Sequence, residues 1–345
     1  MKKLIFLTDY KNKFGSKHFD IPYRSGMDKT KLVRYFSEMG IEASFQFLNE
    51  VRLDDPDLQQ AGVIYTSSED IGYRYKSYIE DVIFALELKG VRVIPAFKHL
   101  RANNNKVFME YLREILNISD NLNATVFGSL KDLEMRIEEL SFPCVFKKAE
   151  GASGKGVALV KNREELISQV KKVSGGIAYW KEDLKDIGRA LKHKGYMKES
   201  VYRDKFIIQD FIPNLTNDWK IYHFGNRQYI INRPILKGRG IKASGGGYDN
   251  YFYGSKAEAP PGIFNLAETI RQKLDVPHVS IDIAYDGKEF YIIEFQSLYF
   301  GTAGIPYSDG FYQIAGEDWV FTEENLEIEK VYADSIASYL KEKST

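Results

Sequence analysis

The sequence lacks several features that mark particular classes of protein. Its 345 residues include one cysteine, Cys144, so no disulfide can form within the chain and a reducing, cytoplasmic setting is expected. No apolar run reaches the ~18–20 residues that a membrane-spanning helix requires. The apolar run Leu4–Leu7 ends at Thr8, which makes it too short for the hydrophobic region of a signal peptide.

The chain also lacks an excess of charge of either sign. It carries 48 Lys and Arg residues against 48 Asp and Glu residues, so we expect neither a nucleic-acid nor a membrane partner. Hydrophobic residues make up 44% of the chain, which is normal for a globular protein with a real core. The length is that of two or three domains.

The first 102 residues alternate strand and helix signals. Short apolar strands and helices with apolar residues on one side follow one another in the order 3–9, 28–39, 41–48, 61–67, 74–89 and 91–96. Strand–helix–strand order of this kind predicts a parallel sheet covered by helices, and hence an α/β domain over residues 1–102. Ligands of such sheets bind beyond the carboxyl ends of the strands.

The remaining sequence divides into two further units. A helix over 103–116, strands near 124–127 and within 142–160, and a polar, weakly patterned stretch predict a second unit over 103–205. From residue 206 the chain becomes rich in strand signals and ends in a helix, which predicts a third unit over 206–345.

Residues 142–160 combine a strand, a glycine-rich loop and a returning strand. Three glycines allow backbone N–H groups to approach an anion: Gly151, Gly154 and Gly156. The loop differs from a P-loop and from a dinucleotide fingerprint, because a strand rather than a helix follows it. It is consistent with a flap that closes over a triphosphate, with Lys147 beneath it and Ser153 as a hydroxyl donor. A solvated turn is equally consistent with the pattern.

Residues 206–235 read as three short strands. The first passes from apolar to polar and back over the segment Gln209-Asp210-Phe211-Ile212. Such a segment can offer backbone N–H and C=O groups to an adenine edge, although an ordinary meander has the same pattern.

Residues 232–250 contain Arg233, Lys242 and three consecutive glycines. Charge and flexibility together suit a loop that orders around an anionic substrate. They suit a disordered basic loop as well.

The strand pair at 280–296 places metal-competent side chains in otherwise apolar strands. Glu294 and Gln296 are two residues apart and share a strand face. A two-residue turn would put Asp282 on the opposite face, whereas a three-residue turn over 285–287 puts it on the same face. We predict the three-residue turn. Two carboxylates and an amide oxygen then suit Mg²⁺, although a polar face without an ion is equally consistent.

The order of these motifs resembles the ATP-grasp superfamily. A lysine opening a helix comes first, followed by a strand lysine with a glycine flap, a hinge, the Asp-Trp-Lys triplet 218–220, an arginine and the acidic pair near the C-terminus. The resemblance covers the whole chain in outline and rests on order and spacing. It implies an ATP-grasp fold with an α/β, parallel-sheet N-terminal domain, a small lid domain and a larger α+β core domain.

The resemblance also implies residue roles. The nucleotide phosphates would be bound by Lys106, Lys147, Gly151, Ser153, Gly154 and Gly156. The adenine hinge would be Gln209, Asp210, Phe211 and Ile212. The Mg²⁺ ligands would be Asp282, Glu294 and Gln296, and the catalytic residues Arg233 and Lys242. The chain departs from the usual pattern at Gln296, where asparagine is usual, and at Lys148, where proline often follows the flap lysine.

Most ATP-grasp enzymes join a carboxylate to an amine or thiol through an acyl phosphate. The resemblance therefore implies a carboxylate–amine ligase that uses ATP and Mg²⁺ on small-molecule or peptide substrates, and dimers are common in the superfamily. A small-molecule kinase on the same scaffold and a nucleotide-binding module without catalysis are the alternatives.

Overall fold

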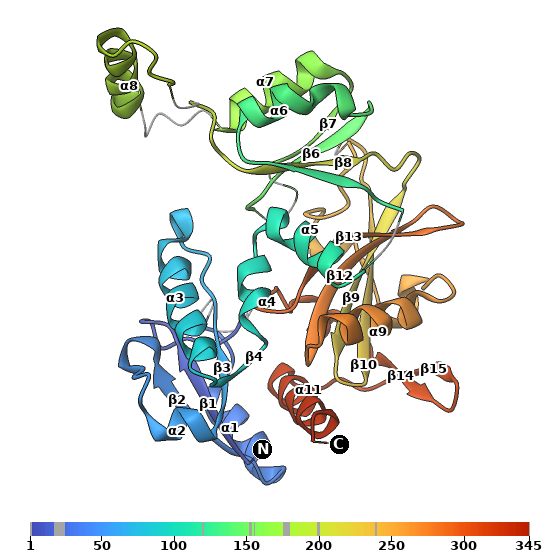
Figure 1. Ribbon diagram of the computed structural model, residues 1–345. Coiled ribbons are helices and arrows are strands. Elements are labelled where there is room, and N and C mark those ends of the chain that lie inside the picture. The colour runs from blue at the N-terminus through green and yellow to red at the C-terminus, as the bar shows by residue number, and fades with distance from the viewer. Residues whose placement is uncertain are drawn as a thin grey trace.

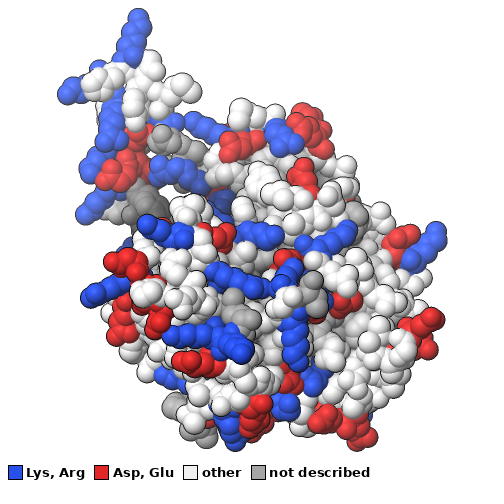
Figure 2. Space-filling view, turned by 60° about the horizontal axis from the view of Figure 1, so that its bottom comes forward, with Lys and Arg blue, Asp and Glu red and all other residues white. Residues whose placement is uncertain are grey.

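The computed structural model describes residues 2–16, 25–118, 121–151, 154, 156–174, 180–198, 201–238 and 240–344. Within these residues the chain forms three sheets, arranged as shown in Figure 1. Lys and Arg side chains are interspersed with Asp and Glu over the face seen in Figure 2, as the balanced composition leads one to expect.

The first sheet is parallel throughout, in the order β2-β1-β3-β4. Its strands are β1 (Lys3–Thr8), β2 (Glu42–Phe47), β3 (Gly62–Tyr65) and β4 (Arg92–Ile94), and its helices are α1 (Lys29–Glu38), α2 (Pro56–Gln60), α3 (Arg74–Leu88) and α4 (Phe97–Ala102). Alternate residues of β1 enter two different cores: Phe6 packs with α1, whereas Leu7 packs with α3. The predicted α/β arrangement of this region is confirmed.

The second sheet is antiparallel, in the order β5-β8-β6-β7. It consists of β5 (Ala124–Phe127), β6 (Cys144–Lys148), β7 (Val157–Val160) and β8 (Phe206–Asp210), with α6 (Leu130–Arg136) and α7 (Arg163–Ser174) packed in the same core. The predicted second unit ends at residue 205. Because β8 pairs with both β5 and β6, this sheet extends past that boundary.

Helix α8 (Trp180–Lys192) projects away from the rest of the molecule (Figure 1). Its apolar residues recur at helical spacing and are exposed to solvent: Trp180, Leu184, Ile187 and Leu191. It belongs to the stretch in which the sequence showed only weak patterning.

The third sheet is antiparallel, in the order β13-β12-β9-β10-β14-β15, with β11 paired to β10. Its strands are β9 (Asn217–Phe224), β10 (Arg227–Pro234), β11 (Phe252–Tyr253), β12 (His278–Tyr285), β13 (Phe290–Gln296), β14 (Phe311–Ala315) and β15 (Asp318–Thr322). The accompanying helices are α5 (Lys106–Ile115), α9 (Ile263–Leu274), α10 (Gly304–Tyr307) and α11 (Ile328–Glu342). Helix α11 shares a core with α1, so the end of the chain packs against its beginning.

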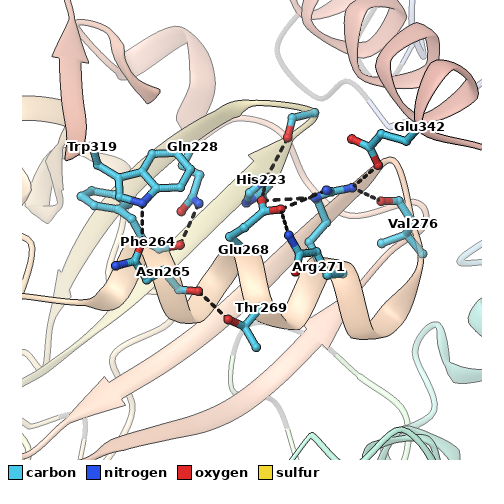
Figure 3. A network of polar contacts seen from close by, with 12 residues as sticks. His223, Gln228, Phe264, Asn265, Glu268, Thr269, Arg271, Val276, Trp319 and Glu342 are labelled. Atoms are coloured by element: carbon cyan, nitrogen blue, oxygen red, sulfur yellow. Dashed lines mark hydrogen bonds and ion pairs between the residues drawn. The ribbon is translucent and has the colours of Figure 1, made fainter. Parts of the chain in front are cut away.

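A network of polar contacts lies between the third sheet and α9, with His223 and Arg271 as its buried members (Figure 3). His223 Nε2 lies 2.9 Å from Glu268 Oε2, and Arg271 Nη2 lies 3.0 Å from Glu268 Oε1. Arg271 also donates to the Val276 carbonyl and contacts Glu342 of α11 at 3.3 Å. Burial alone would raise the pKa of Glu268, but the hydrogen bonds from His223 and Arg271 outweigh it and lower the pKa to about 2. The network joins β9, α9 and α11.

Among the described residues, no helix is both long and apolar enough to cross a membrane.

Candidate active site

A cleft of about 770 Å³ lies between the second and third sheets. Of the residues singled out in the sequence, its lining includes Lys106, Lys147, Gly151, Gly154, Gln209, Asp210, Phe211, Ile212, Arg233, Lys242, Asp282, Glu294 and Gln296. The motifs that the sequence separates by up to two hundred residues therefore surround one space. Gly156 does not line it, and Ser153 lies outside the described residues.

The β12–β13 hairpin brings Asp282 directly opposite Glu294. The predicted three-residue turn is wrong: Tyr285 pairs with Phe290, so the turn covers 286–289, and the Asp286 carboxylate accepts backbone N–H bonds within it. A bulge between Asp282 and Ile283 then shifts the register by one residue. Without it Asp282 and Glu294 would lie on opposite faces; with it they share one face, as predicted, but by a different route.

Both oxygens of Asp282 contact a cation. Lys220 Nζ donates to Oδ1 at 2.8 Å, and Arg233 Nη2 lies 2.9 Å from Oδ2. Arg233 also donates from Nε to Asp218 Oδ1 at 2.6 Å. Burial would raise the pKa of Asp282, but Arg233 and Lys220 outweigh it and hold this pKa well below its usual range. Asp282 is therefore an ionised carboxylate at the wall of the cleft.

Glu294 is the second carboxylate of this face. Gln296 Nε2 donates to its Oε1 at 2.8 Å, and Lys106 Nζ lies 3.6 Å from its Oε2. Lys106 is the first residue of α5 because the Asn105 side chain caps that helix, and its ammonium also donates to the Gly151 carbonyl at 3.0 Å. Lys106 thereby connects the start of a helix, the glycine loop and the acidic face.

Lys147 lies beneath the glycine loop, in the wall formed by the second sheet. Its ammonium donates to the side-chain amide oxygen Oε1 of Gln209, on the neighbouring strand β8. Burial lowers the pKa of Lys147 to about 8, whereas the nearby Glu294 acts in the opposite direction. Lys148 points elsewhere, because its ammonium lies 3.6 Å from Asp204 and donates to the Val173 carbonyl. The geometry thus favours Lys147 over Lys148 as the lysine of the cleft.

The hinge segment lines the cleft where β8 ends. Asp210 is held by Asn123, which does not line the cleft. Its Oδ2 accepts from Asn123 Nδ2 at 2.8 Å, and its backbone N–H donates to the Asn123 carbonyl at 3.0 Å. The Nε2 atom of Gln209 is buried and has no hydrogen-bond partner among the described residues. A buried amide N–H group of this kind can donate a hydrogen bond to an acceptor atom of a bound ligand.

Two loops from different sheets meet over the cleft. Gly154 has φ +69°, and a Cβ atom there would lie 3.1 Å from Cδ of Lys242 and 3.6 Å from Oγ of Ser244. Gly156, with φ +78°, instead packs against Lys148. The close approach of Gly154 to the basic loop explains why a residue without a side chain stands there.

Sequence reasoning missed Asp218 and Lys220 as site residues. The order of motifs includes the triplet 218–220 but predicts no role for it. Strand β9 lies between β10 and β12, so Asp218 pairs with Arg233 and Lys220 pairs with Asp282. Alternation along the strand puts Asp218 and Lys220 on one face, yet the identity of their partners depends on strand pairing that the sequence does not reveal.

The acidic face fits Mg²⁺ by the chemistry of its donors. Among the described residues no group of three or more His, Cys, Asp or Glu side chains is arranged to hold a metal ion. A cation here would depend on Asp282, Glu294 and the amide oxygen of Gln296, completed by oxygens of a bound ligand. Carboxylate and amide oxygens combined with phosphate oxygens are the usual environment of Mg²⁺.

Comparison with known sequences gives a short match. The chain is 32% identical over 84 residues to the formate-dependent phosphoribosylglycinamide formyltransferase of Prochlorococcus marinus (strain MIT 9515), which covers 24% of this chain and 21% of that protein. The chain therefore matches only about a fifth of the length of this relative. No protein-family model matches the chain.

Comparison with solved structures covers nearly the whole chain. A RimK domain ATP-grasp protein from Sphaerobacter thermophilus aligns with a TM-score of 0.54 at 12% identity, over 96% of this chain and 98% of its own. D-alanine–D-alanine ligase from Bacillus anthracis, complexed with ATP, gives 0.51 at 14% identity over 100% and 99%. The ATP-grasp ligase PsnB, complexed with its precursor peptide PsnA2 and AMPPNP, gives 0.52 at 11% identity over 98% of each chain.

At such low identity the likeness concerns the fold. The alignments span 96–100% of the chain that forms the three sheets and the cleft. The sequence resemblance and the structural comparison lead to the same conclusion: this chain has the ATP-grasp fold.

Proposed function

We propose that this protein is an ATP- and Mg²⁺-dependent carboxylate–amine ligase that works through an acyl phosphate. The observation that carries the proposal is the gathering of Lys106, Lys147 and Arg233 around the Asp282–Glu294 pair in one cleft of an ATP-grasp fold. A nucleoside triphosphate needs cations that offset its phosphate charge and carboxylates that hold its metal ion. The three cations and two carboxylates of this cleft would meet both needs. In this proposal the second sheet is the lid and the third sheet is the core.

The proposed reaction has two steps. A substrate carboxylate oxygen attacks the γ-phosphorus of ATP and ADP leaves; an amine nitrogen then attacks the acyl carbon, phosphate leaves and an amide forms. Phosphoryl transfer depends on alignment and charge neutralisation rather than on a protein nucleophile. A bound Mg²⁺ would neutralise charge on the phosphates.

The side chains divide this work according to position. Lys106 and Lys147 would hold phosphate oxygens, and Gln209 to Ile212 would contact the base. Arg233 would stabilise the transferred group, since its guanidinium is fixed by Asp218 and Asp282. The meeting of the glycine loop with Lys242 would keep water from the acyl phosphate.

The test combines purified protein, Mg-ATP and pools of carboxylic acids and amines. ADP and phosphate release should require both an acid and an amine, and mass spectrometry should find the amide. Hydroxylamine in place of the amine should trap the acyl phosphate as a hydroxamate. A stable phosphorylated product formed without an amine would show a kinase, and ATP binding without turnover on any pool would show a binding module.

A further inference from the structure

The acidic face of the cleft is already neutralised by the protein itself. Asp282 contacts Lys220 at 2.8 Å and Arg233 at 2.9 Å, and Glu294 has Lys106 at 3.6 Å. We call these residues, with Asp218 and Lys147, the cleft charge cluster. Before Asp282 can bind a metal ion, one of its oxygens therefore has to lose its contact with a protein cation.

The balance of charge in the cleft charge cluster decides what can enter. Its carboxylates are Asp218, Asp282 and Glu294, and its cations are Lys106, Lys147, Lys220 and Arg233. Each of these carboxylates already contacts at least one of the cations, so a lone divalent cation would have to compete with a protein charge. A nucleotide carries several negative charges and reverses this balance, so a divalent cation and a nucleotide favour each other's entry.

Lys220 and Arg233 differ in how firmly they are held. Arg233 is 5% exposed and is bound by both Asp218 and Asp282. The Lys220 side chain is 19% exposed, and its ammonium reaches Asp282 from the end of a flexible stem, 5.5 Å from the centre of the Tyr222 ring. A lysine ammonium is a compact charge that can swing to a new partner, whereas the doubly bound guanidinium is fixed. Lys220 is thus the movable cation at Asp282.

We propose that Lys220 is an internal counter-ion that keeps free divalent cations off Asp282, so that the metal binds only together with a nucleotide. The inference rests on the proposed function and adds an order of binding to it. When metal and nucleotide enter together, the Lys220 ammonium leaves Asp282 and stays in the cleft beside Tyr222. It is then available to the anionic oxygens of the substrate carboxylate or its acyl phosphate.

Manganese binding tests this directly, because free Mn²⁺ gives an electron paramagnetic resonance signal that disappears on binding. The full-length wild type should bind Mn²⁺ weakly alone and tightly with ADP. Lys220→Met should bind Mn²⁺ without nucleotide at least ~10-fold more tightly than the wild type, since a positive charge beside the carboxylate is gone. Lys220→Arg keeps the charge and should keep the weak binding.

Matched variants keep the test decisive. Lys288→Met removes a lysine from the exposed turn of the same hairpin and should bind Mn²⁺ like the wild type. Lys220→Gln, which retains a polar head, is measured in parallel in case the methionine variant does not fold; the folded state of each is checked by circular dichroism.

Two outcomes would overturn the proposal. One is wild-type protein that binds Mn²⁺ as tightly alone as it does with ADP. The other is folded Lys220→Met and Lys220→Gln proteins that still bind Mn²⁺ alone no better than the wild type. Because this measurement needs no substrate, it stands apart from the ligase test: protein without turnover can still show the Lys220 effect, and an active ligase can fail to show it.

Discussion

Strand β9 carries charged networks on both of its faces, and the two differ in how they end. On the cleft face, Asp218 and Lys220 connect to Arg233 and Asp282. On the opposite face, His223 connects to Glu268 and through it to Arg271. Both networks are largely buried, so burial alone does not distinguish a functional cluster from a structural one.

The distinction lies in where the charges point. The network behind the sheet closes on the protein, since Arg271 ends on the Val276 carbonyl and on Glu342 of the last helix (Figure 3). The network in front consists of residues that line the cleft, among them Lys220, Arg233 and Asp282. The first arrangement fixes helices, whereas the second can exchange a protein partner for a ligand.

The largest effect is expected from Arg233→Met. The change removes the cation shared by Asp218 and Asp282, and activity should fall by roughly 10²–10³-fold, because stabilisation of the transferred group is lost. Stability should also fall by about 3–5 kcal/mol, since the buried Asp218 loses its partner and Asp282 keeps only Lys220. ADP release and urea unfolding measure the two effects.

Arg227→Met is the control for this change. Arg227 lies on the same strand β10 but contacts Asp334, away from the cleft. If it reduces activity as much as Arg233→Met does, the role of Arg233 in the reaction is wrong.

A smaller effect is expected from Asp282→Asn and Glu294→Gln. Both variants should fold, because each keeps the shape of its side chain, and both should lose about 10²-fold in Mg²⁺-dependent activity. Activity measured against Mg²⁺ concentration checks this, with Glu289→Gln in the hairpin turn as the control. If both cleft variants turn over normally, Asp282 and Glu294 are not the residues that bind the metal ion.

The opposite face should respond in stability rather than in activity. Glu268→Gln should retain activity and lose about 1–3 kcal/mol of the free energy of unfolding at neutral pH. The pKa of Glu268 is lowered from 4.5 to about 2 in the folded protein, so its contribution is present above pH 4.5 and is lost as the pH falls towards 2.

Urea unfolding of both proteins at pH 7 and near pH 3 measures this dependence. The difference between wild type and Glu268→Gln should shrink at the lower pH. A constant difference, or a variant that is stable but inactive, would contradict the division between the two faces.

The next effect in size is expected on nucleotide binding, at the lid formed by the second sheet. Lys147→Ala should weaken ADP binding about tenfold, whereas Lys148→Ala should leave it unchanged, because only the first ammonium faces the cleft. With a pKa of about 8, Lys147 loses its charge as the pH rises through that value, so wild-type affinity should fall above pH 8. Isothermal titration calorimetry across pH checks both points, and the reverse ranking would reassign the flap lysine.

The smallest effect is expected from Gly154→Ala. Its new methyl group would press on Lys242, so the KM for ATP should rise several-fold. Gly238→Ala is the matched control, because Gly238 also has a positive φ, +86°, but a Cβ there meets no atom of the described residues within 4 Å. Equal changes in KM would mean that backbone strain rather than the contact between the loops is responsible.

The sequence predicts the parts of this protein that depend on local pattern. Apolar runs and helical spacing identify the strands and helices of the first sheet, and the order of lysines, glycines and carboxylates indicates the ATP-grasp fold. It could not reveal that Lys220 pairs with Asp282 across β9 and β12, because these residues are brought together by strand pairing at long range. The same holds for β8, which follows the predicted boundary at residue 205 but belongs to the second sheet through its pairing with β5 and β6.

The β12–β13 bulge separates the acidic residues from the tip of their hairpin. Register at Asp282 is set by its pairing with β9 on one side and Glu294 on the other, both on the far side of the bulge from residues 286–289. The tip is exposed, so changes of length there should leave the position of both carboxylates intact. It is accordingly a convenient attachment point for a fluorophore or an affinity tag that reports on the cleft without entering it.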